Sequence, residues 1–177
     1  MPGKVRRIVT GVNDAGRSCI FADGLLPTAE VAQGEPVRVG LWATDVSPAS
    51  NEGTYDPVPD GVILRTPPAH RGGTVIRITD IPPERARVYD PDELRRRGCK
   101  TTPERSAKHP GFHATDTVDY AICLEGEIWA VLDEDETLMR PGDVLIQRGT
   151  YHAWSNRSDR VARMAFILID AQPLDNH

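Results

Sequence analysis

The sequence predicts an all-β protein, built as an antiparallel sandwich or barrel with one or two short helices. From Phe112 onward, short apolar runs alternate with turn residues at close spacing, and no helical period appears. Of the 15 prolines in the 177-residue chain, 13 precede Gly111, so strands interrupted by long loops are expected in the first part. The length indicates one domain, or one domain with a sizeable extension.

The first part of the chain contains strand-like runs separated by turn-rich segments. These runs cover residues 6–10, 18–21, 37–42 and 73–78. The first two are joined by turn residues and predict a hairpin, whereas residues 45–60 are expected to form a surface loop. A short connecting helix is expected near residue 94, because Asp90 can cap it, Pro91 suits its first position and Gly98 can end it.

The second part of the chain is more regular. Its strand-like runs cover residues 111–124, 128–132, 137–139, 144–147, 152–156 and 161–169. Because side chains alternate along a strand, His113, Thr115, Thr117 and Asp119 should share one face of the first run. His152 belongs to a later strand. This polar face suits the wet mouth of a barrel interior.

Two imidazoles and a carboxylate from two strands could bind a divalent metal and leave open positions for water or substrate. The alternative from the residues alone is that His113 and His152 are ordinary polar residues of a pocket, held by hydrogen bonds. Spacing by itself favours that alternative. Cys123 shares the inner face, but a small buried core residue is the simpler interpretation.

The segment from Gly111 to Asn156 resembles the two sequence motifs of the cupin superfamily. The first motif is matched by His113, Thr115, Asp119 and Gly126, and the second by Gly142, Gly149, His152 and Asn156. The resemblance implies a cupin jelly-roll β-barrel over residues 70–170, preceded by N-terminal strands and an arm over residues 1–69. A C-terminal tail would cover residues 171–177. The chain is most similar to small single-domain cupins of the cupin 2 conserved-barrel type, some fungal members of which are described as oxidoreductases of aromatic polyketide pathways.

The chain departs from the family pattern at two metal ligands. Thr115 stands where the motif has a second His, and Asp119 stands where it has Glu. An acid shorter by one methylene withdraws its carboxylate by roughly 1.5 Å, so Asp119 could be a ligand, a catalytic base or a partner that orients an imidazole. The resemblance implies His113 and His152 as ligands of Fe, Mn, Zn or Ni. The two replacements predict weak metal binding or none.

We therefore expect a metal-dependent enzyme that acts on a small organic substrate, such as an aromatic or polyketide-like compound. Oxidoreductase or oxygenase chemistry is the first choice, and lyase or isomerase chemistry is close behind. Thr115 and Thr117 would hydrogen-bond substrate or water. The alternative is a metal-free cupin that binds or senses a small ligand without catalysis.

Composition restricts the partners. The net charge of −5 favours neither nucleic acid nor an anionic membrane. No run approaches the ~20 apolar residues of a membrane span, and the N-terminus lacks the apolar segment of a secretion signal, so a cytoplasmic location is expected. Open sheet edges need cover, and an N-terminal arm can supply it between subunits, so we expect a homodimer.

Overall fold

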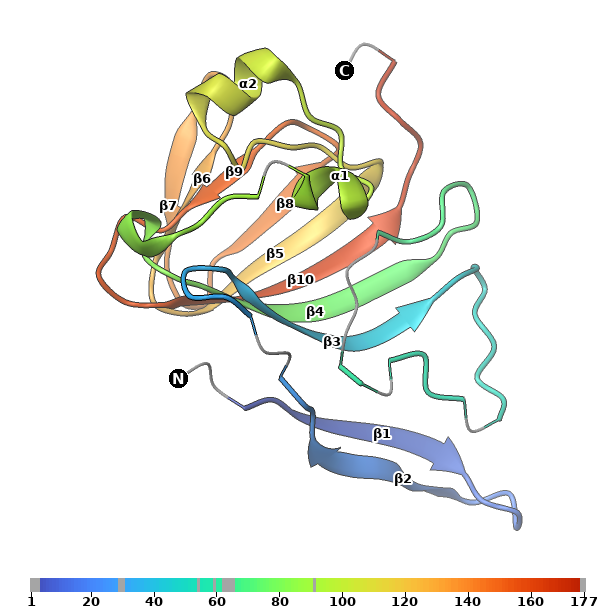
Figure 1. The fold of residues 1–177 in the computed structure, drawn as a ribbon. Coiled ribbons are helices and arrows are strands. Elements are labelled where there is room, and N and C mark those ends of the chain that lie inside the picture. Colours follow the sequence, from blue (N-terminus) through green and yellow to red (C-terminus); the bar gives the residue numbers. More distant parts are fainter. Residues whose placement is uncertain are drawn as a thin grey trace.

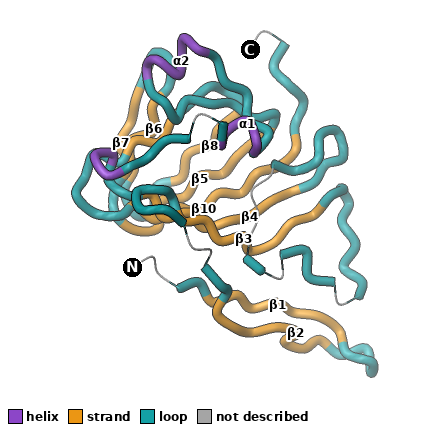
Figure 2. The backbone as a smooth tube through the Cα atoms, viewed as in Figure 1, coloured by secondary structure: helices purple, strands orange, loops and turns teal. Residues whose placement is uncertain are grey.

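The structure, a computed structural model, describes residues 4–28, 31–53, 55–58, 60–61, 66–90 and 92–175. Its strands are β1 (Arg6–Val12), β2 (Ser18–Leu25), β3 (Val37–Thr44), β4 (Thr74–Ile81), β5 (Thr117–Glu125), β6 (Ile128–Val131), β7 (Glu136–Met139), β8 (Val144–Arg148), β9 (Ala153–Ser155) and β10 (Ala162–Asp170). Its helical segments are a 3-10 turn (Glu84–Ala86), α1 (Glu93–Arg96) and α2 (Pro103–Lys108). The all-β prediction is confirmed (Figure 2).

The strands form two facing antiparallel sheets. The larger has the order β3-β4-β10-β5-β8 and the smaller has the order β7-β6-β9, while β1 and β2 form a separate hairpin (Figure 1). Within the described residues these sheets are not joined into one continuously hydrogen-bonded barrel. Two packed sheets are the double-sheet form that jelly rolls adopt.

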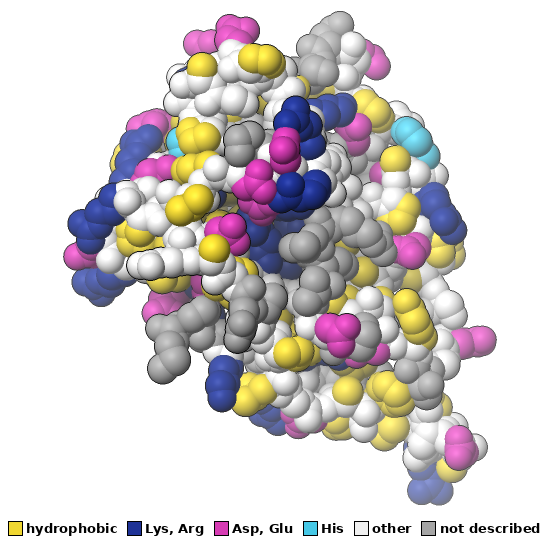
Figure 3. Space-filling view, viewed as in Figure 1, with side chains coloured by type: hydrophobic (Ala, Val, Ile, Leu, Met, Phe, Trp, Pro, Cys, Tyr) yellow, Lys and Arg dark blue, Asp and Glu magenta, His cyan; other side chains and the backbone are white. Residues whose placement is uncertain are grey.

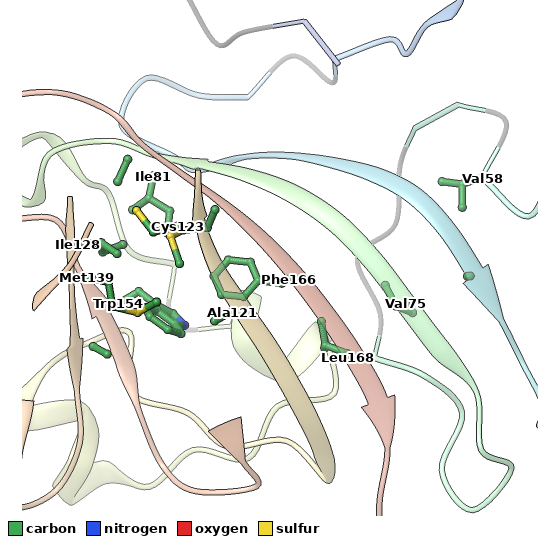
Figure 4. Packing of buried hydrophobic residues seen from close by; sticks show 14 residues of the cluster. Val58, Val75, Ile81, Ala121, Cys123, Ile128, Met139, Trp154, Phe166 and Leu168 are labelled. Carbon is green, nitrogen blue, oxygen red and sulfur yellow. The ribbon is translucent and has the colours of Figure 1, made fainter. Parts of the chain in front are cut away.

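The core lies between the two sheets because alternate residues of each strand point inward. The larger sheet contributes Met164, Phe166 and Leu168 from β10, and the smaller contributes Ile128 and Trp154 (Figure 4). A second cluster around Phe112 and Tyr151 is separate from this core. Cys123 is buried in the main core, as predicted.

Gly126, at the turn between β5 and β6, has φ of +75°, which side chains rarely adopt. A Cβ added there would lie 2.6 Å from the backbone oxygen of Val161. The glycine that ends the first sequence motif is therefore required by the close approach of the chain that leads into β10.

The short helices differ from the prediction. α1 is a single turn whose N-cap is Asp92, and the Asp90 carboxylate accepts a hydrogen bond from the Asp92 amide instead of capping the helix directly. Pro91, expected at the first helical position, lies outside the described residues. The sequence interpretation missed α2, although Thr102 caps it and Pro103 starts it, which is a common helix-start pattern.

Residues before position 70 contribute to the main sheet as well as to the hairpin, because β3 pairs with β4 along its length. Arg7 of β1 forms an ion pair with Asp56 and donates to the carbonyl of Leu41, which ties the hairpin to the body. The packing of this region on a partner subunit stays a prediction. No helix in the described ranges is long and apolar enough to cross a membrane.

Candidate functional site

The two histidines of the sequence motifs lie side by side. His113 and His152 form an isolated antiparallel bridge, in which each backbone N–H donates to the carbonyl of the other at 2.9 Å. This pairing holds their rings with centroids 4.5 Å apart. The strand face that begins at His113 is less regular than predicted, because β5 starts only at Thr117.

Each imidazole is oriented by a carbonyl two residues earlier. Nδ1 of His113 donates to the oxygen of Gly111 at 2.8 Å, and Nδ1 of His152 donates to the oxygen of Thr150 at 3.0 Å. Since a carbonyl oxygen only accepts, each Nδ1 carries a proton, and each Nε2 of the neutral ring keeps its lone pair. Histidines that bind metals are commonly fixed in this way.

Burial keeps both rings neutral. It lowers the pKa of His113 well below its usual value, assisted by His152 and by the positive charge of Arg97. It also lowers the pKa of His152 to about 4. At neutral pH both Nε2 atoms therefore keep a lone pair that can accept a hydrogen bond or bind a cation.

Asp119 of β5 lies on the inner face of the larger sheet and is 7% exposed. Burial raises its pKa to about 6, while Thr117 and the charges of Arg77 and Arg97 oppose this shift. Its Oδ1 atom is buried without a hydrogen-bond partner in the described structure. Near neutral pH this carboxyl group can both hold and release a proton.

The two threonines of the predicted site are hydrogen-bonded to each other. Their hydroxyl oxygens are 2.7 Å apart in a hydrogen bond, and both side chains are buried. Neither Thr115 nor Thr117 is among the described residues that line the cavity beside the histidines. Their proposed contact with substrate or water stays a prediction.

A cavity opens between the larger sheet and α1. His113, His152 and Asp119 all line it. The other described lining residues are Pro36, Arg38, Arg77, Thr79, Ile81, Arg87, Tyr89, Asp90, Glu93, Leu94, Arg97, Pro110, Gly111, Trp154 and Phe166. α1 lies over the concave face of the sheet and forms part of the roof (Figure 1).

The sequence interpretation missed the arginines of this cavity. Arg77 lies on β4 in phase with the buried Val75 and Thr79, so a charge interrupts an otherwise inward-facing series. The alternation that places Arg77 on the same face as Val75 and Thr79 can be recognised in the sequence. Arg97 is the C-cap residue of α1 and is only 9% exposed. Its place in the cavity depends on how the loop folds back over the sheet.

His109, in the segment between α2 and Gly111, belongs to a hydrogen-bonded cluster. The Tyr89 hydroxyl donates to Glu84 at 2.5 Å, and His109 Nε2 lies 3.3 Å from the same carboxylate. Hydrogen bonds from His109 and Tyr89 overcome the effect of burial and lower the pKa of Glu84 to about 2. This cluster fixes Tyr89 at the cavity wall.

The donors of the cavity fit a divalent transition metal only in part. Two neutral imidazoles with free Nε2 atoms are suitable ligands for such an ion. Among the described residues, however, no three His, Cys, Asp or Glu side chains form a group that could hold a metal. Asp119 shares the cavity with His113 and His152 but does not complete such a group.

No family model matches the chain. The chain is 34% identical over 138 residues to the phomopsin biosynthesis cluster protein C′ of Diaporthe leptostromiformis. The aligned region covers 76% of this chain and 61% of that protein. The chain is also 28% identical over 174 residues to the cupin-domain-containing oxidoreductase fogC of Aspergillus ruber. That alignment covers 94% of this chain and 73% of fogC. The chain spans about three fifths of the length of the curated relatives it matches first.

Among solved structures, the cupin domain of Schizosaccharomyces pombe Cnp3 aligns with a TM-score of 0.45 and 9% identity. This alignment covers 96% of the chain and 89% of that domain.

Proposed function

This chain belongs to the cupin superfamily, and we propose that it is an oxidoreductase-type enzyme that converts a small organic substrate in the cavity beside His113 and His152. The juxtaposition of two buried, neutral imidazoles carries this proposal. Relatives named as cupin-domain-containing oxidoreductases support the reaction class. The names of other relatives, which refer to biosynthesis clusters, support a substrate from secondary metabolism.

The residues of the cavity suit proton transfer to and from a bound substrate. The Nε2 lone pairs of His113 and His152 can accept hydrogen bonds from a substrate, and their Nδ1–H groups hold the rings in place. Asp119 can exchange a proton near neutral pH because its pKa is about 6. The largely buried rings of Trp154 and Phe166 form part of the cavity wall and would shield a bound substrate from water.

We propose His113 and His152 as the protein ligands of a divalent transition metal, with Asp119 as ligand or base. When bound, such a metal would polarise a carbonyl or enolate oxygen of the substrate. Support comes from the two free Nε2 atoms and from the unpartnered Oδ1 of Asp119.

Elemental analysis of the purified protein tests this assignment. Near-stoichiometric Fe, Mn, Ni or Zn in the wild type, and its loss in the His113→Ala/His152→Ala double variant, would support the assignment. His70→Asn is the matched control, since His70 is an exposed loop histidine with φ of +61°. Equal metal content in the wild type and the double variant would contradict the assignment.

The reaction class has its own test in the organism that makes the protein. Deletion of the coding sequence should remove one metabolite and accumulate another that differs by two hydrogens or by one oxygen, which mass spectrometry would detect. Accumulation of a compound at the same oxidation level as the missing product would instead identify a lyase or an isomerase.

A metal-free ligand-binding module is the second candidate. It is favoured by the lack of a three-ligand group in the described chain and by the arginines that share the cavity with the histidines. It predicts no bound metal and no thermal shift on addition of Fe, Mn, Ni or Zn, and no change in metabolite oxidation level after deletion.

A further inference from the structure

Buried polar atoms without partners gather in one place. Six side-chain nitrogen or oxygen atoms are buried without a hydrogen bond in the described structure, and five belong to residues that line the cavity. These five are Arg77 Nε, Thr79 Oγ1, Arg87 Nε, Arg97 Nε and Asp119 Oδ1. Such atoms are rare in folded proteins, and each costs free energy. Their concentration indicates a site prepared for a polar ligand.

Arg77 is the most exceptional of these residues. It lies on a central strand of the larger sheet and is 7% exposed. Within the described chain its guanidinium forms neither a hydrogen bond nor an ion pair, and its Cζ lies over the face of the Phe166 ring at 6.0 Å from the ring centroid. A buried charge without a partner destabilises the fold strongly. The position of Arg77 therefore has no structural explanation in the described contacts.

The neighbouring arginines are only partly neutralised. Glu93 of α1 lies 2.8 Å from a terminal nitrogen of Arg38 and 3.7 Å from one of Arg97, so one carboxylate serves two guanidinium groups. Arg87 donates to the carbonyl of Trp154 and stacks on Tyr89. Arg77 takes part in none of these ion pairs, hydrogen bonds or stacking contacts.

The charges of the wall leave a positive excess. The described lining contains the four arginines Arg38, Arg77, Arg87 and Arg97, against the three carboxylates of Asp90, Glu93 and Asp119. Asp90 is already ion-paired with Arg96 outside this lining, so only Glu93 and Asp119 face the four arginines. Positive charge is therefore in excess, and a bound carboxylate would reduce it. Figure 3 shows basic side chains recessed in the hollow beside α1.

We propose that the cavity binds a carboxylate of its organic substrate on Arg77 and Arg97, next to the paired imidazoles. The planar fork of a guanidinium matches a carboxylate, and charge-assisted hydrogen bonds are stronger when water is excluded. The apolar wall of Ile81, Leu94 and Trp154 would contact the rest of the molecule. This inference rests on the proposed use of the cavity as the substrate site, but it requires neither a metal nor turnover.

The test uses ligands that differ in charge at nearly constant shape. Acetate and benzoate are compared with acetamide and benzamide, and with inorganic phosphate, at constant ionic strength by thermal shift and calorimetry. Carboxylates should bind and stabilise the full chain, whereas the amides should not. Arg77→Met should weaken carboxylate binding by about 10- to 100-fold, in keeping with the loss of hydrogen bonds to a charged group.

The same variant separates a ligand site from a structural role. Without ligand, Arg77→Met should have an unchanged or higher melting temperature, since it removes a buried unpaired charge. Arg160→Met, which alters an arginine whose side chain is 88% exposed, is the control and should bind carboxylate like the wild type.

Three results would overturn the inference: no carboxylate binding, equal binding of the amides, or unchanged binding by Arg77→Met. Binding of phosphate alone would also overturn it and indicate a phosphorylated ligand. A protein that binds carboxylates yet contains no metal and leaves metabolite oxidation levels unchanged would refute the enzyme assignment while supporting the anion site.

Discussion

Replacement of Asn156 by alanine should unfold the turn before β10 and destabilise the whole domain. Asn156 is 0% exposed, and its amide nitrogen donates to the carbonyls of Ile81 at 2.9 Å and Arg160 at 2.7 Å. Its Oδ1 accepts from the amide and the hydroxyl of Ser158 at 3.1 and 2.8 Å. The side chain therefore connects the end of β4 to the turn that enters β10.

The magnitude follows from these four bonds. A typical intramolecular hydrogen bond contributes about 1 kcal/mol, and a buried group left without a partner costs more. Asn156→Ala should therefore lower the free energy of unfolding by roughly 4 kcal/mol. For a chain of this length that corresponds to a fall in the melting temperature of about 8–16 °C.

Urea unfolding followed by tryptophan fluorescence measures this change, because Trp154 is buried in the core. Ser158→Ala is the graded control, since it removes the hydroxyl but keeps the backbone amide, and it should cost only about 1 kcal/mol. A loss below about 1 kcal/mol for Asn156→Ala would refute this account of the residue.

Three further predictions concern other parts of the molecule. Glu84→Gln should be less stable than the wild type at pH 7, because the pKa of Glu84 is about 2 in the folded protein and near 4.5 in the unfolded chain. The difference in unfolding free energy between the two proteins should disappear as the pH falls from about 4.5 towards 2, which urea melts at several pH values would measure. If the protein is a homodimer that packs through the exposed hairpin face, where Ile20 is 58% exposed, Ile20→Lys should convert it to a monomer in light scattering; an unchanged mass would exclude that face. Gly126→Ala should lower the melting temperature, whereas Gly24→Ala should not, because an added Cβ meets Val161 only at Gly126; equal effects would show that the close approach is unimportant.

Most of the strands could be predicted from the sequence because their signals are local. The runs that became β6, β7 and β8 combine alternating apolar residues with strong turn residues at both ends, and the structure begins and ends each within one residue of the prediction. The segment before β5 was misjudged. Residues 112–116 also alternate, but they form only isolated bridges to Lys100 and His152, so a strand pattern did not produce a strand.

The pairing of His113 with His152 was predicted from the motif resemblance, not from local pattern. Their contact joins residues 39 positions apart through a two-residue bridge, and nothing in either segment alone specifies that separation. The arginine wall was missed for a related reason. The alternation of β4 places Arg77 on the same face as buried residues, and this can be recognised in the sequence. Arg97, in contrast, reaches the cavity only because α1 folds over the larger sheet.

The replacement of a motif histidine by Thr115 and the arginines of the cavity both weaken the affinity of this site for a cation. Thr115 removes an imidazole from the ligand set and instead pairs its hydroxyl with Thr117. Arg77 and Arg97 add positive charge near His113, which disfavours a cation there as it disfavours the protonated imidazole. A carboxylate bound on these arginines would offset that repulsion. By linkage, a bound anion would then raise the affinity of the histidines for a cation, and a cation would raise the affinity of the arginines for the anion.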